Sequence, residues 1–86
     1  MFKIKEEIEL KELAKFGFEE YNGYYVLFGN NQYEKLIEVF ETELFINVQL
    51  YEDRFYQSYV DEKCLNKLLG VLFDLTLAGI IEKVGE

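Results

Sequence analysis

The sequence predicts a single α+β domain over residues 1–86, built as α-β-β-β-(β)-α: an antiparallel β-meander of three to four strands, packed on one face by an N-terminal and a C-terminal helix. Three observations predict it. Apolar residues recur at helical spacing near both ends of the chain, and they alternate with polar residues through its middle. No proline, repeat or change of composition divides the chain. A chain of this length has room for only one hydrophobic core.

The first predicted element is an amphipathic helix from Lys5 to Lys15, with apolar residues at i, i+3 and i+4 and acidic residues toward its start. Gly17 follows where a left-handed helix stop is favoured, so we expect the helix to end at about Phe16. Phe18, just beyond it, is expected to fold back onto Leu13.

Three strands are predicted next. Tyr21 to Phe28 is aromatic and β-branched, and Gly29-Asn30-Asn31 after it suits a hairpin turn. Tyr33 to Glu41 and Glu43 to Tyr51 alternate as the second and third strands, and their join could be a tight turn or a bulge in one long ribbon. A fourth short strand at Arg54 to Tyr59 is an option.

The last predicted element is a helix from Glu62 to Ala78, with a broad apolar face. Asp61 is its candidate N-cap, and Gly79 is its predicted stop. The tail from Ile80 to Val84 is expected to lie beside the sheet as a short strand or to pack as an irregular segment.

Composition excludes most hydrolase chemistry, although carboxylates or tyrosines could still act as acid and base. The chain has no histidine, one cysteine (Cys64) and one serine (Ser58), so it cannot build a Ser/His/Asp, Cys/His or zinc-ligand site by itself. A domain this small also has little volume for a substrate pocket. We therefore expect a protein that is not an enzyme and that has no cofactor and no metal site.

Charge and hydropathy point to an acidic cytoplasmic protein. The 17 acidic and nine basic residues give a net charge of -8, and Arg54 is the only arginine, so neither nucleic acid nor an anionic membrane is an expected ligand. No signal-peptide pattern opens the sequence. The apolar stretch from Leu68 to Ile81, about 14 residues, is shorter than the ~20 that cross a bilayer. We expect the cytoplasm of a host cell.

The face of the sheet turned away from the helices is the candidate site. Alternation assigns Ile37, Val39, Leu44, Ile46, Val48 and Leu50 to the helix side. It leaves the other side with Leu36, Glu38, Phe40, Phe45, Asn47, Gln49 and Tyr51. Aromatic rings among carboxylates and amides suit protein recognition. The candidate protein-binding residues are Glu38, Phe40, Phe45 and Tyr51, with Glu52 and Asp53 at the rim.

Two simpler explanations of that face remain open. A small protein rich in Phe and Tyr must expose some of its rings, and the C-terminal tail could cover them. The acid excess has alternatives too: it could mimic the phosphates of a nucleic acid and compete for a basic groove, or it could serve only solubility.

Two segments carry a resemblance, Leu10 to Leu27 (LKELAKFGFEEYNGYYVL) and Leu72 to Val84 (LFDLTLAGIIEKV). Together they resemble small acidic accessory proteins encoded by phages and prophages of AT-rich bacteria, some of which are anti-CRISPR or other anti-defence inhibitors. The resemblance implies a protein that acts by binding. It carries over no functional residue.

The expected function is that of a non-enzymatic accessory factor, from a phage or mobile element, which inhibits or modulates a host protein. A basic nucleic-acid-processing protein of the host is the partner that an acidic surface would suit. The alternative is a self-associating structural or assembly module, a twofold dimer joined through the outer sheet faces or the edge strands.

Overall fold

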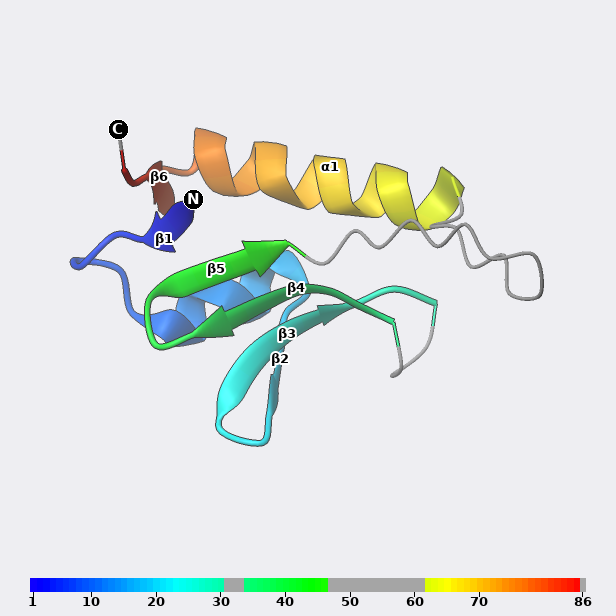
Figure 1. Cartoon of the computed structure of the whole chain (residues 1–86), viewed down its shortest axis with the longest axis horizontal. Coiled ribbons are helices and arrows are strands. Elements are labelled where there is room, and N and C mark those ends of the chain that lie inside the picture. Colours follow the sequence, from blue (N-terminus) through cyan, green and yellow to red (C-terminus); the bar gives the residue numbers. More distant parts are fainter. Residues whose placement is uncertain (31–33, 47–61, 86) are drawn as a thin grey trace.

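The computed structural model describes residues 1–30, 34–46 and 62–85. In order, its elements are β1 (Phe2–Ile4), the 3-10 helix η1 (Leu10–Phe16), β2 (Glu19–Tyr21), β3 (Tyr24–Phe28), β4 (Lys35–Phe40), β5 (Glu43–Ile46), α1 (Glu62–Leu77) and β6 (Ile81–Lys83). The α+β class is confirmed: helical elements near both ends pack on an antiparallel sheet (Figure 1). The optional strand at 54–59 and the Asp61 cap lie outside the described residues.

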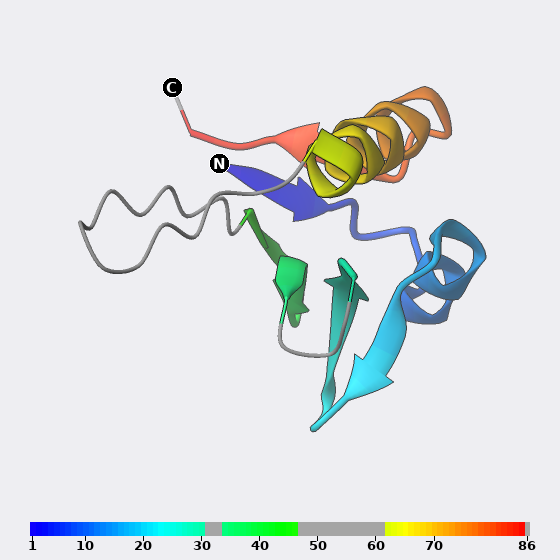
Figure 2. The same ribbon diagram turned by 90° about the vertical axis from the view of Figure 1, so that its right-hand side faces the viewer.

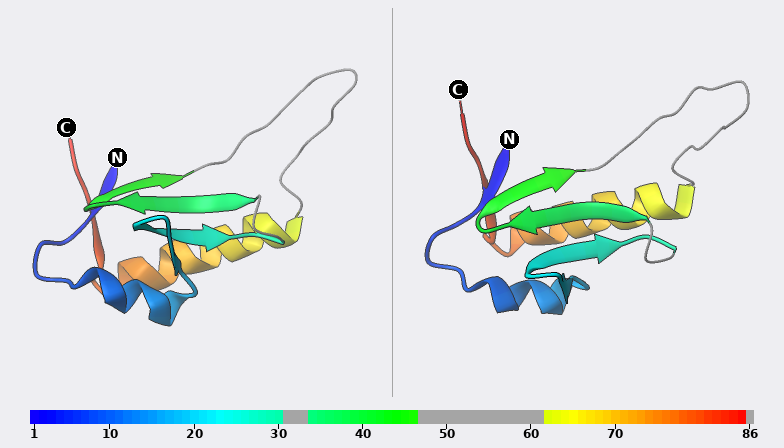
Figure 3. Two further views of the ribbon diagram at one scale, coloured as in Figure 1. Left: turned by 90° about the horizontal axis from the view of Figure 1, so that it is seen from below. Right: turned by 60° about the horizontal axis from the view of Figure 1, so that its bottom comes forward.

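The sheet has six strands in the order β2-β3-β4-β5-β1-β6, all antiparallel, where the sequence predicted three to four. One additional strand is β1, which lies between β5 and β6. Phe2 is opposite both Leu44 and Lys83, and Ile4 is opposite Ile81. The two ends of the chain therefore lie side by side (Figures 1 and 3). The tail from Ile80 to Val84 contains the short strand β6, which confirms one of the two alternatives predicted for it.

The hydrophobic core lies between one face of the sheet and the two helical elements, which share the same side of the sheet (Figure 2). It unites Leu13 of η1 with Leu68 and Leu75 of α1. From the sheet it takes residues that were predicted to face the helices, among them Ile37, Val39 and Leu44.

The first helical element is a 3-10 helix and not the predicted α-helix, and it begins at Leu10, not at Lys5. Its inward side chains, Leu10, Leu13 and Phe16, are spaced three residues apart, which matches the three residues per turn of a 3-10 helix. Its end is as predicted. Gly17 has a φ of 95°, and its amide and that of Phe18 donate to carbonyls of the last turn.

The prediction of one strand from Tyr21 to Phe28 is wrong. Asn22 and Gly23 both have positive φ, 48° and 84°, and form a two-residue turn between β2 and β3. Asn-Gly is the strongest short hairpin signal in a sequence, because both residues adopt the left-handed region readily. The segment therefore makes a hairpin whose two strands bring Tyr21 opposite Tyr24.

Leu36 lies in the core and not on the outer face that alternation assigned to it. The register shifts between Leu27 and Phe28: Leu27 is opposite Ile37, but Phe28 is opposite Lys35. The additional residue on β4 is Leu36, so this bulge changes the side of the sheet to which it points. Ile46, at the described end of β5, lies opposite Ile37 as expected but is 38% exposed. The join after Phe40 is a tight turn, with Glu41 at φ 55° and Phe40 opposite Glu43.

The C-terminal helix ends as predicted. Gly79 has a φ of 72°, and the Ile80 amide donates to the Leu75 carbonyl. At its other end α1 is bound to the β3–β4 hairpin by two polar contacts. Lys67 Nζ donates to the Phe28 carbonyl at 2.7 Å, and the buried Cys64 thiol donates to Glu34 Oε2 at 3.2 Å.

Candidate functional site

The outer face is the side of the six-stranded sheet that is turned away from α1 and η1. Paired residues of neighbouring strands point to the same side of a sheet, so the pairing defines it. Glu38 is opposite Phe45, and Phe40 is opposite Glu43. The structure thus places the predicted residues Glu38, Phe40 and Phe45 together on one face. The other three predicted residues, Tyr51, Glu52 and Asp53, lie outside the described residues.

Five aromatic rings form a continuous row across this face, and we call them the aromatic cluster: Tyr21, Tyr24, Phe28, Phe40 and Phe45. Tyr21 contacts Phe28 and Tyr24 edge to face, with centroids 5.8 and 5.9 Å apart. The Tyr24 and Phe40 rings stack at 4.3 Å with 20° between their planes. Phe40 meets Phe45 edge to face at 5.8 Å.

The aromatic cluster extends over four consecutive strands, β2 to β5, so the pairing of these strands fixes its shape. Val26 lies on the same face, opposite Glu38, and is fully buried although it is not part of the main core. Along β3 it is flanked on that face by Tyr24 and Phe28. Val26 and the aromatic residues on either side of it along β3 therefore form a small apolar layer on this face. The face is therefore an ordered surface and not a set of separate exposed rings.

Lys35 lies at the centre of this layer. Its ammonium donates to the Tyr24 hydroxyl at 3.0 Å and sits 4.9 Å from the centroid of the Tyr21 ring and 5.7 Å from that of Tyr24. Cation–π contacts of this length favour the charged form of a lysine. The hydrogen bond to Tyr24 is the main reason that the pKa of Lys35 is raised above its ordinary value.

Carboxylates surround the rings. By strand pairing, Glu19 shares the outer face with Val26, and Glu43 shares it with Phe40 and Lys3. Lys3 is 3.7 Å from Glu82, its neighbour on β6. Among the described residues, the outer face therefore carries four carboxylates, Glu19, Glu38, Glu43 and Glu82, against the two ammonium groups of Lys3 and Lys35, both of which have partners within the chain.

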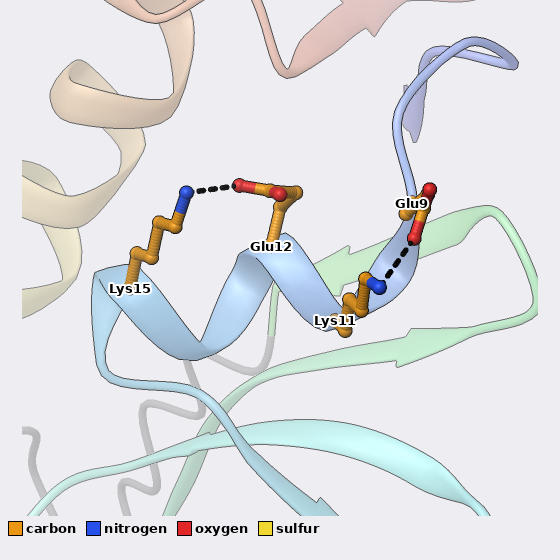
Figure 4. Close-up of polar contacts among 4 residues, drawn as sticks. All are labelled: Glu9, Lys11, Glu12 and Lys15. Atoms are coloured by element: carbon orange, nitrogen blue, oxygen red, sulfur yellow. Dashed lines mark ion pairs between the residues drawn. The ribbon is translucent and has the colours of Figure 1, made fainter.

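Other charged contacts lie away from this face and are ordinary surface pairs. On η1, Lys15 Nζ is 2.7 Å from Glu12 and Lys11 Nζ is 3.0 Å from Glu9 (Figure 4). The hydrogen bond from Lys15 lowers the pKa of Glu12. Both pairs are well exposed to solvent, where such contacts contribute little to stability.

The sequence predicts the outer-face position of two of the five rings, Phe40 and Phe45. It places Tyr21, Tyr24 and Phe28 in a single strand and gives no position on this face for them or for Lys35. The signal was present in the Asn22-Gly23 pair: a hairpin at this turn puts Tyr21 opposite Tyr24 on one face.

Within 1–30, 34–46 and 62–85, no three Cys, Asp or Glu side chains gather as metal ligands do. Over the same residues, no helix is long and apolar enough to cross a membrane. Comparisons with protein-family models, with curated proteins and with solved structures gave no match.

Proposed function

We propose that this chain works by binding another protein through its outer face, with the aromatic cluster at the centre of the contact. The observation that carries the proposal is the continuous row of five rings over a buried Val26. Phe40 and Phe45 are 42% and 39% exposed, so each retains area to bury against a partner. Ordered aromatic side chains lose little conformational entropy on binding and are typical of the residues that dominate interface energies.

The charges around the rings favour a basic partner. Two copies of this face would bring carboxylate toward carboxylate, which disfavours self-pairing here. The sheet edges are also poor sites for self-pairing, because β2 and β6 are three residues long and are rich in charge. A partner with Lys and Arg around an apolar contact would complement the face.

The class of partner to test first follows from this charge and from the resemblance to phage-encoded accessory proteins. It is a host protein with a basic groove, such as a nucleic-acid-processing protein of a defence system, which the chain would inhibit or modulate by occupying that groove. The bound chain would then exclude the groove's normal ligand.

The experiment begins with site-specific photocrosslinking in host lysate. A photoreactive residue at Phe45 should crosslink the partner, and the same residue at Lys11, on η1 and exposed, serves as the matched control. Binding of the purified partner is then measured for Phe40→Ser and Phe45→Ser, with Ala14→Ser at an exposed position of η1 as the control variant. We expect each outer-face change to raise Kd by about tenfold or more, since losing a central aromatic contact costs 1–4 kcal/mol.

The control should bind as the unaltered chain does. Equal crosslinking from Phe45 and Lys11, or a Kd indifferent to both Phe substitutions, would show that the outer face is not the binding surface.

A further inference from the structure

A second apolar surface lies on α1, on the side turned away from its core residues Cys64, Leu68 and Leu75. Its four members recur at every fourth position and are large exposed side chains, and we call them the α1 ridge: Leu65 (39% exposed), Leu69 (55%), Phe73 (64%) and Leu77 (71%). Side chains at this spacing form the ridges by which helices pack against one another. None of the four lies on the outer face, which is on the opposite side of the sheet.

We propose that two copies of the chain form a twofold dimer in which their α1 helices pack antiparallel through this ridge. The inference is independent of the proposed function. A twofold contact uses the same patch on both copies, so the patch must be complementary to itself. The ridge meets this condition: pairing about the level of Val71 sets Leu65 of one copy beside Leu77 of the other, and Leu69 beside Phe73.

Charge identifies a second copy as the occupant. The whole chain carries -8, yet α1 contains only Glu62 and Asp74 against Lys63 and Lys67, which sum to zero. The helix is therefore a surface where two such acidic chains can meet with little repulsion.

Gly70 supports the same crossing. It lies mid-helix beside Leu69 and Phe73, where glycine is less favourable than alanine. A Cβ at this position would meet nothing within 4 Å, so packing within one copy does not require glycine. Close approach of a second helix does, because a glycine lets two backbones pack tightly at the point where they cross.

The test is the mass of the intact chain by sedimentation equilibrium and light scattering, from about 10 µM to 1 mM. The ridge from Leu65 to Leu77 is about 18 Å long, so it buries less area than a standard interface and should bind weakly. We expect a monomer–dimer equilibrium that tightens with salt, because salt screens the repulsion between the acidic chains. Leu69→Ser and Phe73→Ser should each weaken it by about tenfold or more, whereas Phe45→Ser should leave it unchanged.

Circular dichroism of each ridge variant at low concentration confirms that the fold is retained, so that loss of the dimer is not a loss of folding.

Gly70→Ala should make the single chain more resistant to heat and weaken the dimer at the same time. A monomeric mass at 1 mM and 0.5 M salt would overturn the proposal. So would a dimer that Phe45→Ser breaks and the ridge variants do not.

Discussion

At the scale of single residues, Lys35 explains how a cation is accommodated in an aromatic layer. Tyr24 has two contacts in this layer: its hydroxyl accepts a hydrogen bond from the Lys35 ammonium, and its ring stacks on Phe40. The Lys35 ammonium in turn lies over the rings of both Tyr21 and Tyr24, and these contacts restrict the orientation of the Tyr24 ring. One side chain thus joins the β2–β3 hairpin to β4 at the position where the proposed partner would bind.

The raised pKa of Lys35 provides a direct measurement of this arrangement. Because its folded pKa lies above the unfolded one, its contribution to stability is fully present below about pH 10 and is lost as pH rises through the folded value. Tyr24→Phe removes the acceptor and keeps the ring, so the pKa of Lys35 should fall toward its ordinary value. NMR titration of the Lys35 side chain measures it.

Tyr21→Phe is the matched control, because the Tyr21 hydroxyl accepts no hydrogen bond from Lys35 and acts on it only through charge, as the smallest of the causes. Its effect on the pKa of Lys35 should therefore be smaller. Equal titration curves for Tyr24→Phe and the unaltered chain would mean that the hydrogen bond does not set this pKa.

At the scale of elements, the contact between α1 and the β3–β4 hairpin depends on Gly29. A Cβ there would lie 2.9 Å from Cys64 Sγ and 3.2 Å from Glu34 Cβ, and neither atom is the end of a long flexible side chain. Gly29→Ala should destabilise the fold by about 1–3 kcal/mol, as overpacking does. For a domain of this size that lowers Tm by roughly 4–8 °C per kcal/mol.

The control for this prediction is Gly70→Ala, measured at low concentration. It adds the same methyl group to a glycine with open space around it, and helix propensity predicts a gain of up to about 1 kcal/mol. Thermal unfolding should thus shift in opposite directions for the two variants. A Gly29→Ala chain as stable as the unaltered one would show that the hairpin and α1 are not in close contact.

The elements differ in how much of them the sequence could predict. The C-terminal ends of both helical elements were predicted well, because Gly17 and Gly79 supply the left-handed conformation locally. The side to which Phe40 and Phe45 point followed from strict alternation. Leu36 could not be placed in this way, since its bulge is set by how β3 and β4 pair and not by either strand alone.

Two further elements depend on distant parts of the chain. β1 and β6 are three residues each, too short for a periodic pattern, and they become strands by pairing with one another from opposite ends of the sequence. The aromatic cluster has the same origin. Phe40 and Phe45 come from one hairpin and the other three rings from another, so the complete site exists only once β3 pairs with β4.

At the scale of the whole molecule, the outer face and the α1 ridge lie on opposite sides of the same sheet. A dimer through α1 would therefore leave both outer faces free, and two linked faces would raise the effective concentration for a partner with more than one site. The two surfaces also differ in charge. The outer face has an excess of carboxylates, whereas α1 has no net charge.

This difference predicts opposite responses to salt. From about 50 to 500 mM salt, binding of a basic partner to the outer face should weaken, mainly because association slows, while the α1 dimer should tighten.

Glu19→Gln with Glu43→Gln should reduce the salt dependence of partner binding, since both carboxylates lie on that face, and should slow association by several-fold at low salt. The same double variant should leave the dimer constant nearly unchanged. Surface plasmon resonance measures the association and dissociation rates of partner binding, and sedimentation equilibrium measures the dimer constant. If partner binding is flat across this range and indifferent to the two amides, the carboxylates serve solubility alone and the partner need not be basic. If salt moves both equilibria in the same direction, the two surfaces are not electrostatically distinct.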